Sequence, residues 1–292
     1  MIKILSNNKY FEIIVNALNY LFARYNKTRD ESKQIIWEIT DKIDYLNIDD
    51  TYILFNPQNL NLMPINYIIY NFEQLTITVD NGMTNFDKTY WNKLQNAKYV
   101  WDYSQMNIEY LKVNHNINAI FFPMGWTPTM KQLNPIKWSE RINTIMFIGL
   151  MNERRRNFLK PIHTYFKEEN LNMYLSNKCW NEEYIHISSI SKIALNIHYY
   201  SGNTILEIHR IIPLILHDIW VCSERSQDKI YDELFDGIVD WVDTYTCTTR
   251  IKEVLDYSID DIDKELKERK RRLIIRCDYW KIFNDNEIIN YI

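Results

Sequence analysis

The sequence has few cysteines and no cysteine motif. Four cysteines occur among 292 residues. They form no CxxC pair and no cysteine–histidine pair with zinc spacing, and the six histidines form no zinc motif either. A chain of this length does not need disulfide bonds to stabilise its core. We therefore expect free, reduced cysteines at Cys179, Cys222, Cys247 and Cys277.

Long apolar runs and an excess of basic residues are also missing. No segment approaches the roughly 18 consecutive apolar residues of a membrane-spanning helix. The apolar run from Met1 to Leu5 is too short, and too soon followed by polar residues, to be a secretory signal. The net charge of −4 argues against a dedicated nucleic-acid-binding protein. We expect a cytoplasmic protein, in the host cytoplasm if the source is a virus, with no nucleic-acid partner.

The residues that are present have the composition of a folded protein. Hydrophobic residues make up 46% and charged residues 25% of the chain, which excludes disorder as the main state. In the first 125 residues, short apolar runs such as Ile2–Leu5 and Tyr67–Tyr70 alternate with segments of helical periodicity, among them Phe11–Ala23 and Glu31–Ile43. This pattern predicts parallel strands that are buried on both faces and connected by helices.

The alternation is interrupted once and then restarts. Three of the seven prolines, Pro123, Pro128 and Pro135, mark a stretch that regular structure does not tolerate. We therefore predict an N-terminal domain over residues 1–125, a linker over 126–140, a second domain over 141–265 and a final helical segment over 266–292. Two successive α/β halves predict two Rossmann-like domains facing each other across a cleft, with ligands at the carboxyl ends of the strands.

The most informative segment is Asn196–Arg210. A strand with polar residues at its end is followed by a glycine turn, and then by a helix that we predict to start at Asn203 and Thr204. Free backbone N–H groups at such a start favour a phosphate, and Glu207, one turn inside, could accept hydrogen bonds from a ribose diol. A purely structural interpretation is also open, in which Asn203 caps the helix, Glu207 offsets its dipole and Arg210 pairs with Glu207. The candidate binding residues of this segment are His198, Gly202, Asn203, Thr204, Glu207 and Arg210.

This segment resembles the donor half of the GT-B glycosyltransferases. The resemblance rests on the strand, the glycine turn and the helix with its internal Glu207, followed by Ile211–Leu214 and Trp220–Glu224. It implies that Glu207 binds the ribose of a nucleotide-diphosphate sugar and that Ser223-Glu224 closes one side of the pocket. The residues that it places against the diphosphate are Gly202, Asn203 and Thr204. It also implies that the final helical segment packs back toward the N-terminal domain.

The sequence departs from this family at one position. Many retaining members carry an E-x7-E motif, whose first glutamate lies eight positions before the ribose-binding one. Tyr199 occupies that position here. The departure leaves the stereochemical outcome, inverting or retaining, open.

A second segment, Phe147–Arg156, ends a strand in Gly149 and continues with a basic helix start. It resembles the first strand–helix turn of the GT-B donor domain, where a glycine lets the backbone approach the donor and a basic residue neutralises phosphate. Arginines at a helix start are disfavoured by the helix dipole unless an anion is near. We therefore predict that Arg154 or Arg155 binds the departing diphosphate without a metal ion. A solvated basic helix start is the alternative.

Two carboxylates in the N-terminal half follow strands in the same way. Glu73 lies three residues after the run Tyr67–Tyr70, and Asp102 follows Tyr99–Trp101. Either carboxylate could act as the general base on an acceptor hydroxyl. Strand-end carboxylates also cap the next helix, a role that suits Asp102 well.

We expect no metal ion and no cofactor apart from the nucleotide sugar as co-substrate. Asp261 and Asp263 form a DxD string, but they lie at the start of the last helix, where acidic residues stabilise helices. The basic run Lys267–Arg272 lies on the same helix with interleaved acids. It predicts a solvated face or attraction to an acidic membrane surface rather than a nucleic-acid site.

The predicted function is therefore transfer of a sugar from a nucleotide-diphosphate sugar to a glycan, lipid or protein acceptor. Two alternatives remain from the sequence: a nucleotide-sugar epimerase or phosphorylase on the same fold, and a non-catalytic scaffold subunit. Turnover of labelled donor, with and without acceptor, distinguishes these three possibilities.

Overall fold

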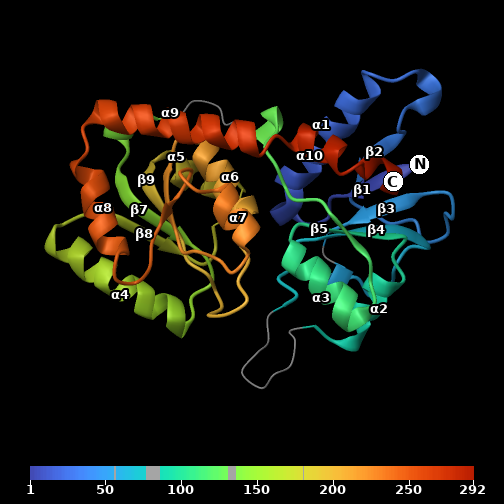
Figure 1. The fold of residues 1–292 in the computed structure, drawn as a ribbon, viewed down its shortest axis with the longest axis horizontal. Coiled ribbons are helices and arrows are strands. Elements are labelled where there is room, and N and C mark those ends of the chain that lie inside the picture. Colours follow the sequence, from blue (N-terminus) through green and yellow to red (C-terminus); the bar gives the residue numbers. More distant parts are fainter. Residues whose placement is uncertain (56, 77–85, 131–135, 180) are drawn as a thin grey trace. The chain divides into compact units, whose positions relative to one another are not determined.

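Two units make up the chain, one of them assembled from both of its ends (Figure 1). The computed structural model describes residues 1–55, 57–76, 86–130, 136–179 and 181–292. Unit 1 consists of residues 1–130 and 277–292, and unit 2 of residues 131–276. The predicted linker over residues 126–140 spans the first boundary, and the predicted final segment over residues 266–292 is divided between the units.

Unit 1 contains a six-stranded parallel sheet in the order β2-β1-β3-β4-β5-β6. The apolar runs of the sequence form its central strands, which are buried on both faces. The strands are β1 (Ile2–Leu5), β2 (Trp37–Thr40), β3 (Thr51–Leu54), β4 (Asn66–Asn71), β5 (Tyr99–Asp102) and β6 (Ala119–Phe121). The helices of the unit are α1 (Glu12–Asn26), α2 (Lys88–Gln95), α3 (Gln105–His115) and α10 (Tyr279–Asp285).

The end of the chain completes the core of unit 1. The hydroxyls of Tyr70 and Tyr279 lie 2.6 Å apart, and the ring of Tyr279 packs against Phe122. Gly125 is required here, because a Cβ at this position would lie 2.6 Å from the carbonyl oxygen of Cys277. Residues 277–292 are therefore an integral part of the first unit, and Figure 1 shows them (red) returning to the N-terminal (blue) elements.

The helix predicted over Glu31–Ile43 is wrong. The structure has a 3-10 turn at Glu31–Lys33 and then β2, which pairs in parallel with β1. Trp37 fixes this edge strand, because its indole N–H donates to Asn19 Oδ1 on α1 at 2.9 Å and its ring packs edge-on against Phe22. Tertiary contacts thus override the local helical pattern.

Unit 2 contains a five-stranded parallel sheet in the order β11-β10-β9-β7-β8. Its strands are β7 (Asn143–Ile148), β8 (Met173–Ser176), β9 (Ser191–Asn196), β10 (Trp220–Ser223) and β11 (Asp240–Trp241). Its helices are α4 (Glu153–Glu168), α5 (Asn181–Ser189), α6 (Ile208–Leu216), α7 (Lys229–Leu234), α8 (Cys247–Asp256) and α9 (Ile259–Arg276). The apolar faces of α4 and α8 share one core with β7, β9 and β10.

Both units have the same strand arrangement. The first strand of each unit has the second strand on one side and the third on the other, and the remaining strands follow in sequence. In such a sheet the connections leave in opposite directions from the first and third strands, which opens a crevice at their carboxyl ends where ligands bind. In unit 2 this switch point lies between β7 and β9.

Two predicted helices have other limits in the structure. The helix predicted to start at Asn203 and Thr204 begins at Ile208, so Glu207 is its N-cap residue rather than an internal one. The long helix predicted to reach Ile282 ends at Arg276, and Asp278 caps the separate helix α10. In the part of the chain that the structure describes, no helix combines the length and the apolar character needed to cross a membrane.

Candidate functional site

The start of α4 is fastened to the segment that leaves β9, across the switch point of unit 2. Three successive carbonyl oxygens, those of residues 197–199, each accept a hydrogen bond from a side chain of α4 or its cap. Arg155 Nη2 binds the carbonyl of residue 197 at 2.6 Å, Arg154 Nη1 that of residue 198 at 2.7 Å, and Asn152 Nδ2 that of residue 199 at 2.7 Å. The arginines predicted to bind phosphate therefore also hold two loops together.

Arg155 is the more deeply buried of the two predicted arginines, with 3% of its surface exposed. Its Nε and Nη2 bind the carbonyl of Ile197, and its Nη1 donates to the carbonyl of Leu150 at 2.7 Å. Burial, followed by the positive charge of Arg210, lowers the pKa of Arg155 to about 10. Gly149 makes room for this side chain, since a Cβ there would lie 2.9 Å from Arg155 Nη1.

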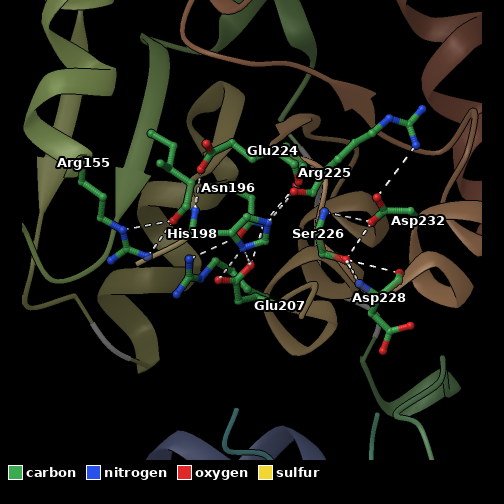
Figure 2. Close-up of polar contacts among 12 residues, drawn as sticks. Arg155, Asn196, His198, Glu207, Glu224, Arg225, Ser226, Asp228 and Asp232 are labelled. Atoms are coloured by element: carbon green, nitrogen blue, oxygen red, sulfur yellow. Dashed lines mark hydrogen bonds and ion pairs between the residues drawn. The ribbon is translucent and has the colours of Figure 1, made fainter. Parts of the chain in front are cut away.

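A buried group of polar side chains joins β9 to the start of α6 (Figure 2). Asn196, the last residue of β9, donates from Nδ2 to Glu207 Oε2 at 2.9 Å. His198 Nδ1 lies 3.0 Å from the same carboxylate oxygen. Asn196 Nδ2 also reaches Ser223 Oγ, at the end of β10, at 3.0 Å. The amide of Asn196 thus joins the carboxyl ends of two strands to Glu207, the N-cap of α6, whose exposed fraction is 7%.

The two titratable members of this group shift each other's pKa. Burial works to lower the pKa of His198, but the charge and the hydrogen bond of Glu207 outweigh it and the pKa is raised. Burial works to raise the pKa of Glu207, but His198, with a further contribution from Arg210, holds it well below its usual range. The pair therefore favours an imidazolium beside an ionised carboxylate.

Arg210 approaches the same group from α6. Its Nη1 donates to Asn196 Oδ1 at 3.2 Å. The predicted pairing of Arg210 with Glu207 takes the form of a charge interaction that contributes to the low pKa of the carboxylate.

A second ion pair lies beside this group. Arg154 makes a two-pronged contact with Glu224, which follows β10, and Nη1 lies 2.9 Å from Glu224 Oε2. The same Oε2 accepts the backbone N–H of His198 at 2.8 Å. His198 in turn reaches the carbonyl oxygen of Arg225 with Nε2 at 3.2 Å. Glu224 therefore links the ends of β9 and β10 to the start of α4.

The three residues predicted to face a diphosphate lie in the turn between β9 and α6. Gly202 has open space around it, since a Cβ there would meet nothing within 4 Å. Asn203 has a left-handed backbone with φ of 50°, and its N–H donates to Gln227 Oε1 at 2.9 Å. The carbonyl of Thr204 accepts the N–H of Gln227 at 2.9 Å. These bonds to Gln227 explain why the helix does not begin at Asn203.

The loop after β10 forms its own hydrogen-bonded turn, also drawn in Figure 2. Ser226 donates from Oγ to Asp232 Oδ1 at 2.8 Å and from its backbone N–H to the same atom at 3.1 Å. The guanidinium of Arg225 lies over the ring of Trp241 at 4.7 Å and pairs with Asp236 at 3.3 Å. These contacts fix the backbone of residues 225 and 226, which directly follow Glu224.

The carboxylates predicted in unit 1 have different environments. Asp102 ends β5 and is fully buried. It accepts hydrogen bonds from Asn71 Nδ2 at 2.7 Å, the N–H of Ser104 at 2.8 Å and Asn107 Nδ2 at 3.0 Å. These two asparagines also bind the carbonyl oxygen of Glu73, at 3.0 Å and 2.8 Å. Asp102 thus supports the turn that carries Glu73.

Glu73 is half-buried, and its carboxylate accepts a hydrogen bond from Gln58 Nε2 at 2.9 Å. Burial raises the pKa of Glu73, against the opposing effect of the bond from Gln58. A carboxylate with a raised pKa is a better proton acceptor, as a general base requires.

Sequence reasoning assigned no role to the side chain of Asn196 and only a pocket wall to Glu224. Both are polar residues at the carboxyl end of an apolar strand, Asn196 as its last residue and Glu224 just after it, and that position is the signal that could have identified them. The structure brings His198, Glu207 and Arg210 together with Asn196. Glu73 and Asp102 belong to unit 1 and form a separate group.

The remaining charged segments have structural partners. Asp261 accepts the hydroxyl hydrogen of Ser258 and its N–H binds the same hydroxyl, at the start of α9. In the basic run, Arg269 pairs with Asp240, and Lys270 pairs with Asp218. Arg271 and Arg272 share Glu268. Among the described residues, no group of three or more His, Cys, Asp or Glu side chains is arranged to hold a metal ion.

No protein-family model and no curated protein matches the sequence. Solved structures do match. An α-glucosyltransferase in complex with UDP and a DNA containing an HMU base superposes with a TM-score of 0.59 at 10% identity, over 99% of this chain and 98% of that one. HepE of Anabaena, in complex with UDP and glucose, gives 0.54 at 10% identity over 100% and 99%. The chain has the GT-B fold.

Other GT-B structures are longer than this chain. TarM superposes with a TM-score of 0.53 at 13% identity over 96% of this chain, which spans 60% of the TarM chain. This chain also spans 57% of the matched chain in the GtfA/B complex. The predicted α/β class is thus confirmed, and the GT-B likeness at these identities concerns the fold alone.

Proposed function

We propose that the protein is a glycosyltransferase that transfers a sugar from a nucleotide-diphosphate sugar to an acceptor, with the donor bound at the carboxyl edge of the unit 2 sheet. The observation that carries the proposal is Glu207. It is a buried, ionised carboxylate at the N-cap of α6, beside the switch point at which such sheets bind ligands. Strongly shifted titratable groups in such places are typical of functional sites.

Glu207 is suited to the ribose of the donor. An ionised carboxylate accepts hydrogen bonds from two vicinal hydroxyls, and His198 and Asn196 hold this one in a fixed orientation. Burying the charge of Glu207 costs free energy, which these two partners offset. The carboxylate is therefore held ionised and ready to accept hydrogen bonds from a ligand. The UDP in the HepE and α-glucosyltransferase structures leads us to propose UDP as the nucleotide.

The diphosphate would lie beside the turn that contains Gly202, Asn203 and Thr204, with positive charge from Arg154 and Arg210. Gly202 leaves space for close approach of a ligand to the backbone. Arg155 contributes charge, while its hydrogen bonds hold the loops on either side of the switch point. Positive charge of this kind stabilises a departing diphosphate, and we propose that transfer proceeds without a metal ion.

Glu73 is our candidate for the general base on the acceptor hydroxyl. Its raised pKa and its partial exposure suit proton removal. Asp102, the other predicted carboxylate, is fully buried among donors, so we propose that it positions the turn of Glu73 rather than meeting substrate. Its two carboxylate oxygens accept hydrogen bonds from Asn71, Ser104 and Asn107.

The test is calorimetric titration with UDP, GDP, ADP, CMP and dTDP, followed by turnover of the matching radiolabelled sugar donor. We expect selective binding of UDP, and release of UDP that depends on an acceptor and persists in EDTA. Because the α-glucosyltransferase structure contains DNA, the acceptor panel includes duplex DNA beside glycans, lipids and proteins. Binding without turnover would favour the scaffold alternative, and product formed without acceptor would favour an epimerase. Absence of binding to every nucleotide would refute the proposal.

A further inference from the structure

Glu224 is the acid that the proposed donor site does not use, although it lies within the same network. It follows β10 and its side chain is 12% exposed. Three donors converge on its carboxylate: both terminal nitrogens of Arg154 and the backbone N–H of His198, the last at 2.8 Å. Figure 2 shows Glu224 beside His198 and above Glu207.

This set of donors is one that recognises tetrahedral anions as well as carboxylates. A guanidinium presents two parallel N–H groups that match two oxygens of a phosphate as closely as two oxygens of a carboxylate. A backbone N–H at the carboxyl edge of a parallel sheet is a common additional phosphate ligand. The positions occupied by Glu224 Oε1 and Oε2 therefore coincide with those that two phosphate oxygens would take.

The charges around the pair support this interpretation. Two further arginines lie close by, since Arg155 and Arg210 bind the carbonyl of residue 197 and Asn196 respectively. Both arginines interact electrostatically with Glu207, whose carboxylate is engaged by His198 and Asn196. An incoming anion that takes the same two terminal nitrogens of Arg154 has to displace Glu224 from them.

We propose that Glu224 is a resident competitor that fills a phosphate subsite of this chain, formed by Arg154 and the N–H of His198. The inference rests on the proposed function in so far as the phosphate belongs to a nucleoside diphosphate. A diphosphate that binds takes over the fork of Arg154, and Glu224 swings away or contacts the ligand's hydroxyl groups. The affinity for diphosphate is therefore lower than it would be if Arg154 and the N–H of His198 were not already bound to Glu224.

The experiment is isothermal titration of the full chain with UDP and, in parallel, with inorganic pyrophosphate. Glu224→Gln keeps the shape of the side chain and removes its charge. We expect it to bind both probes more tightly, by roughly a factor of ten, the equivalent of one charge-assisted hydrogen bond. The matched control is Glu233→Gln, which removes the same charge from an exposed position on α7 and should leave both affinities unchanged.

A second pair of variants tests the route of the effect. Arg154→Met removes the fork, so UDP should bind more weakly, and adding Glu224→Gln to it should restore little. Coupling of this kind between the two substitutions is what direct competition predicts. Circular dichroism and the melting temperature of each variant check that it is folded before its affinity is compared.

The outcomes separate this inference from the proposed function. Equal or weaker binding of both probes by folded Glu224→Gln overturns the inference, as does an equal gain in the Arg154→Met background. Tighter pyrophosphate binding by Glu224→Gln in a protein that ignores every nucleotide would support the subsite and refute the glycosyltransferase proposal. UDP binding that is unchanged by Glu224→Gln would support the glycosyltransferase proposal and refute the phosphate subsite.

Discussion

The two units use one strand order to build two different edges. In unit 2 the carboxyl ends of the strands carry opposite charges close together, including the Arg154–Glu224 and His198–Glu207 pairs. In unit 1 the corresponding edge carries the buried carboxylate of Asp102, surrounded by amide and backbone donors. The shared topology creates the edge, and the residues at the strand ends decide its chemistry.

The difference also shows how each unit stabilises its loops. Unit 2 uses arginine side chains that reach across the switch point to the carbonyls of residues 197–199. Unit 1 uses asparagines together with aromatic packing, in which Tyr70 stacks on Phe122 at 5.0 Å. Unit 1 has one charged side chain in a similar role, since Lys93 donates to the carbonyls of Pro57 and Leu60, but the amides of Asn71 and Asn107 hold the turn of Glu73. Variants in the two units should accordingly affect different measurements.

The largest effect should follow from Glu207→Ala. The change leaves the imidazolium of His198 and the amide of Asn196 without their buried partner, at a cost of about 3–5 kcal/mol in the free energy of unfolding. UDP should bind at least ~100-fold more weakly, because the proposed ribose contact is lost. Urea unfolding and calorimetric titration measure the two effects. Unaltered UDP affinity in a folded Glu207→Ala protein would remove the ribose assignment.

Glu73→Gln should lower the rate without lowering donor affinity. Loss of a general base costs roughly 10²–10⁴-fold in turnover, while the amide still accepts the hydrogen bond of Gln58. In the parent the rate should fall as pH drops through the raised pKa of Glu73, because the base becomes protonated, and this acid limb should disappear in the variant. Initial rates against pH, with UDP titration as the control, test it. A weakened UDP affinity would contradict the assignment of donor binding to unit 2 and of proton removal to Glu73 in unit 1.

Asp102→Asn should act on unit 1 alone. The substituted amide presents N–H groups to Asn71 and Asn107, which are donors themselves, at a cost of about 1–3 kcal/mol in the free energy of unfolding. Turnover should fall because the turn of Glu73 loses its support, and UDP affinity should stay at the parent value. Chemical denaturation combined with kinetics provides the measurement. Full activity would mean that the turn of Glu73 does not depend on Asp102.

The smallest effect is the pH dependence of stability in unit 2. The pKa of His198 is raised in the folded state, so its contribution is complete below the unfolded value of about 6.5 and is lost as pH rises through the folded value. The pKa of Glu207 is lowered, so its contribution is present above the unfolded value of about 4.3 and is lost in strong acid. We expect the free energy of unfolding to decline as pH rises above the unfolded value of His198, about 6.5, and through its raised folded value, at about 1.4 kcal/mol for each unit of pKa shift. His198→Gln should flatten this slope, and an unchanged slope would rule out the pair as its source.

Much of the fold could be predicted because the buried strands are short apolar runs. The run ending in Gly149 is β7 and the one ending at Asn196 is β9, and both were recognisable without any contact information. The edge strand β2 was not, because it is half-exposed and Trp37 obtains its partners from α1. An edge strand with one pairing side has a weak pattern of its own.

The site could be predicted only in part, for a related reason. Glu207 and His198 were identified from their positions after a strand, but their mutual contact depends on a turn of about ten residues whose path no pattern describes. The partners of Arg155 are backbone carbonyls. Every residue has such a carbonyl, so the identity of the residues does not indicate which of them Arg155 binds. The start of α6 was misplaced because Gln227, distant in sequence, binds the backbone of Asn203 and Thr204. Hydrogen bonds from side chains to the backbone therefore could not be predicted from sequence patterns.

The return of residues 277–292 to unit 1 has a consequence for the order of synthesis. A ribosome completes residues 131–276 before it makes Tyr279, whose hydroxyl meets that of Tyr70 in the core of unit 1. The first 130 residues therefore lack one of their core aromatic side chains until the whole of unit 2 has been synthesised. Truncation of the last 16 residues should accordingly destabilise the half of the protein that is translated first.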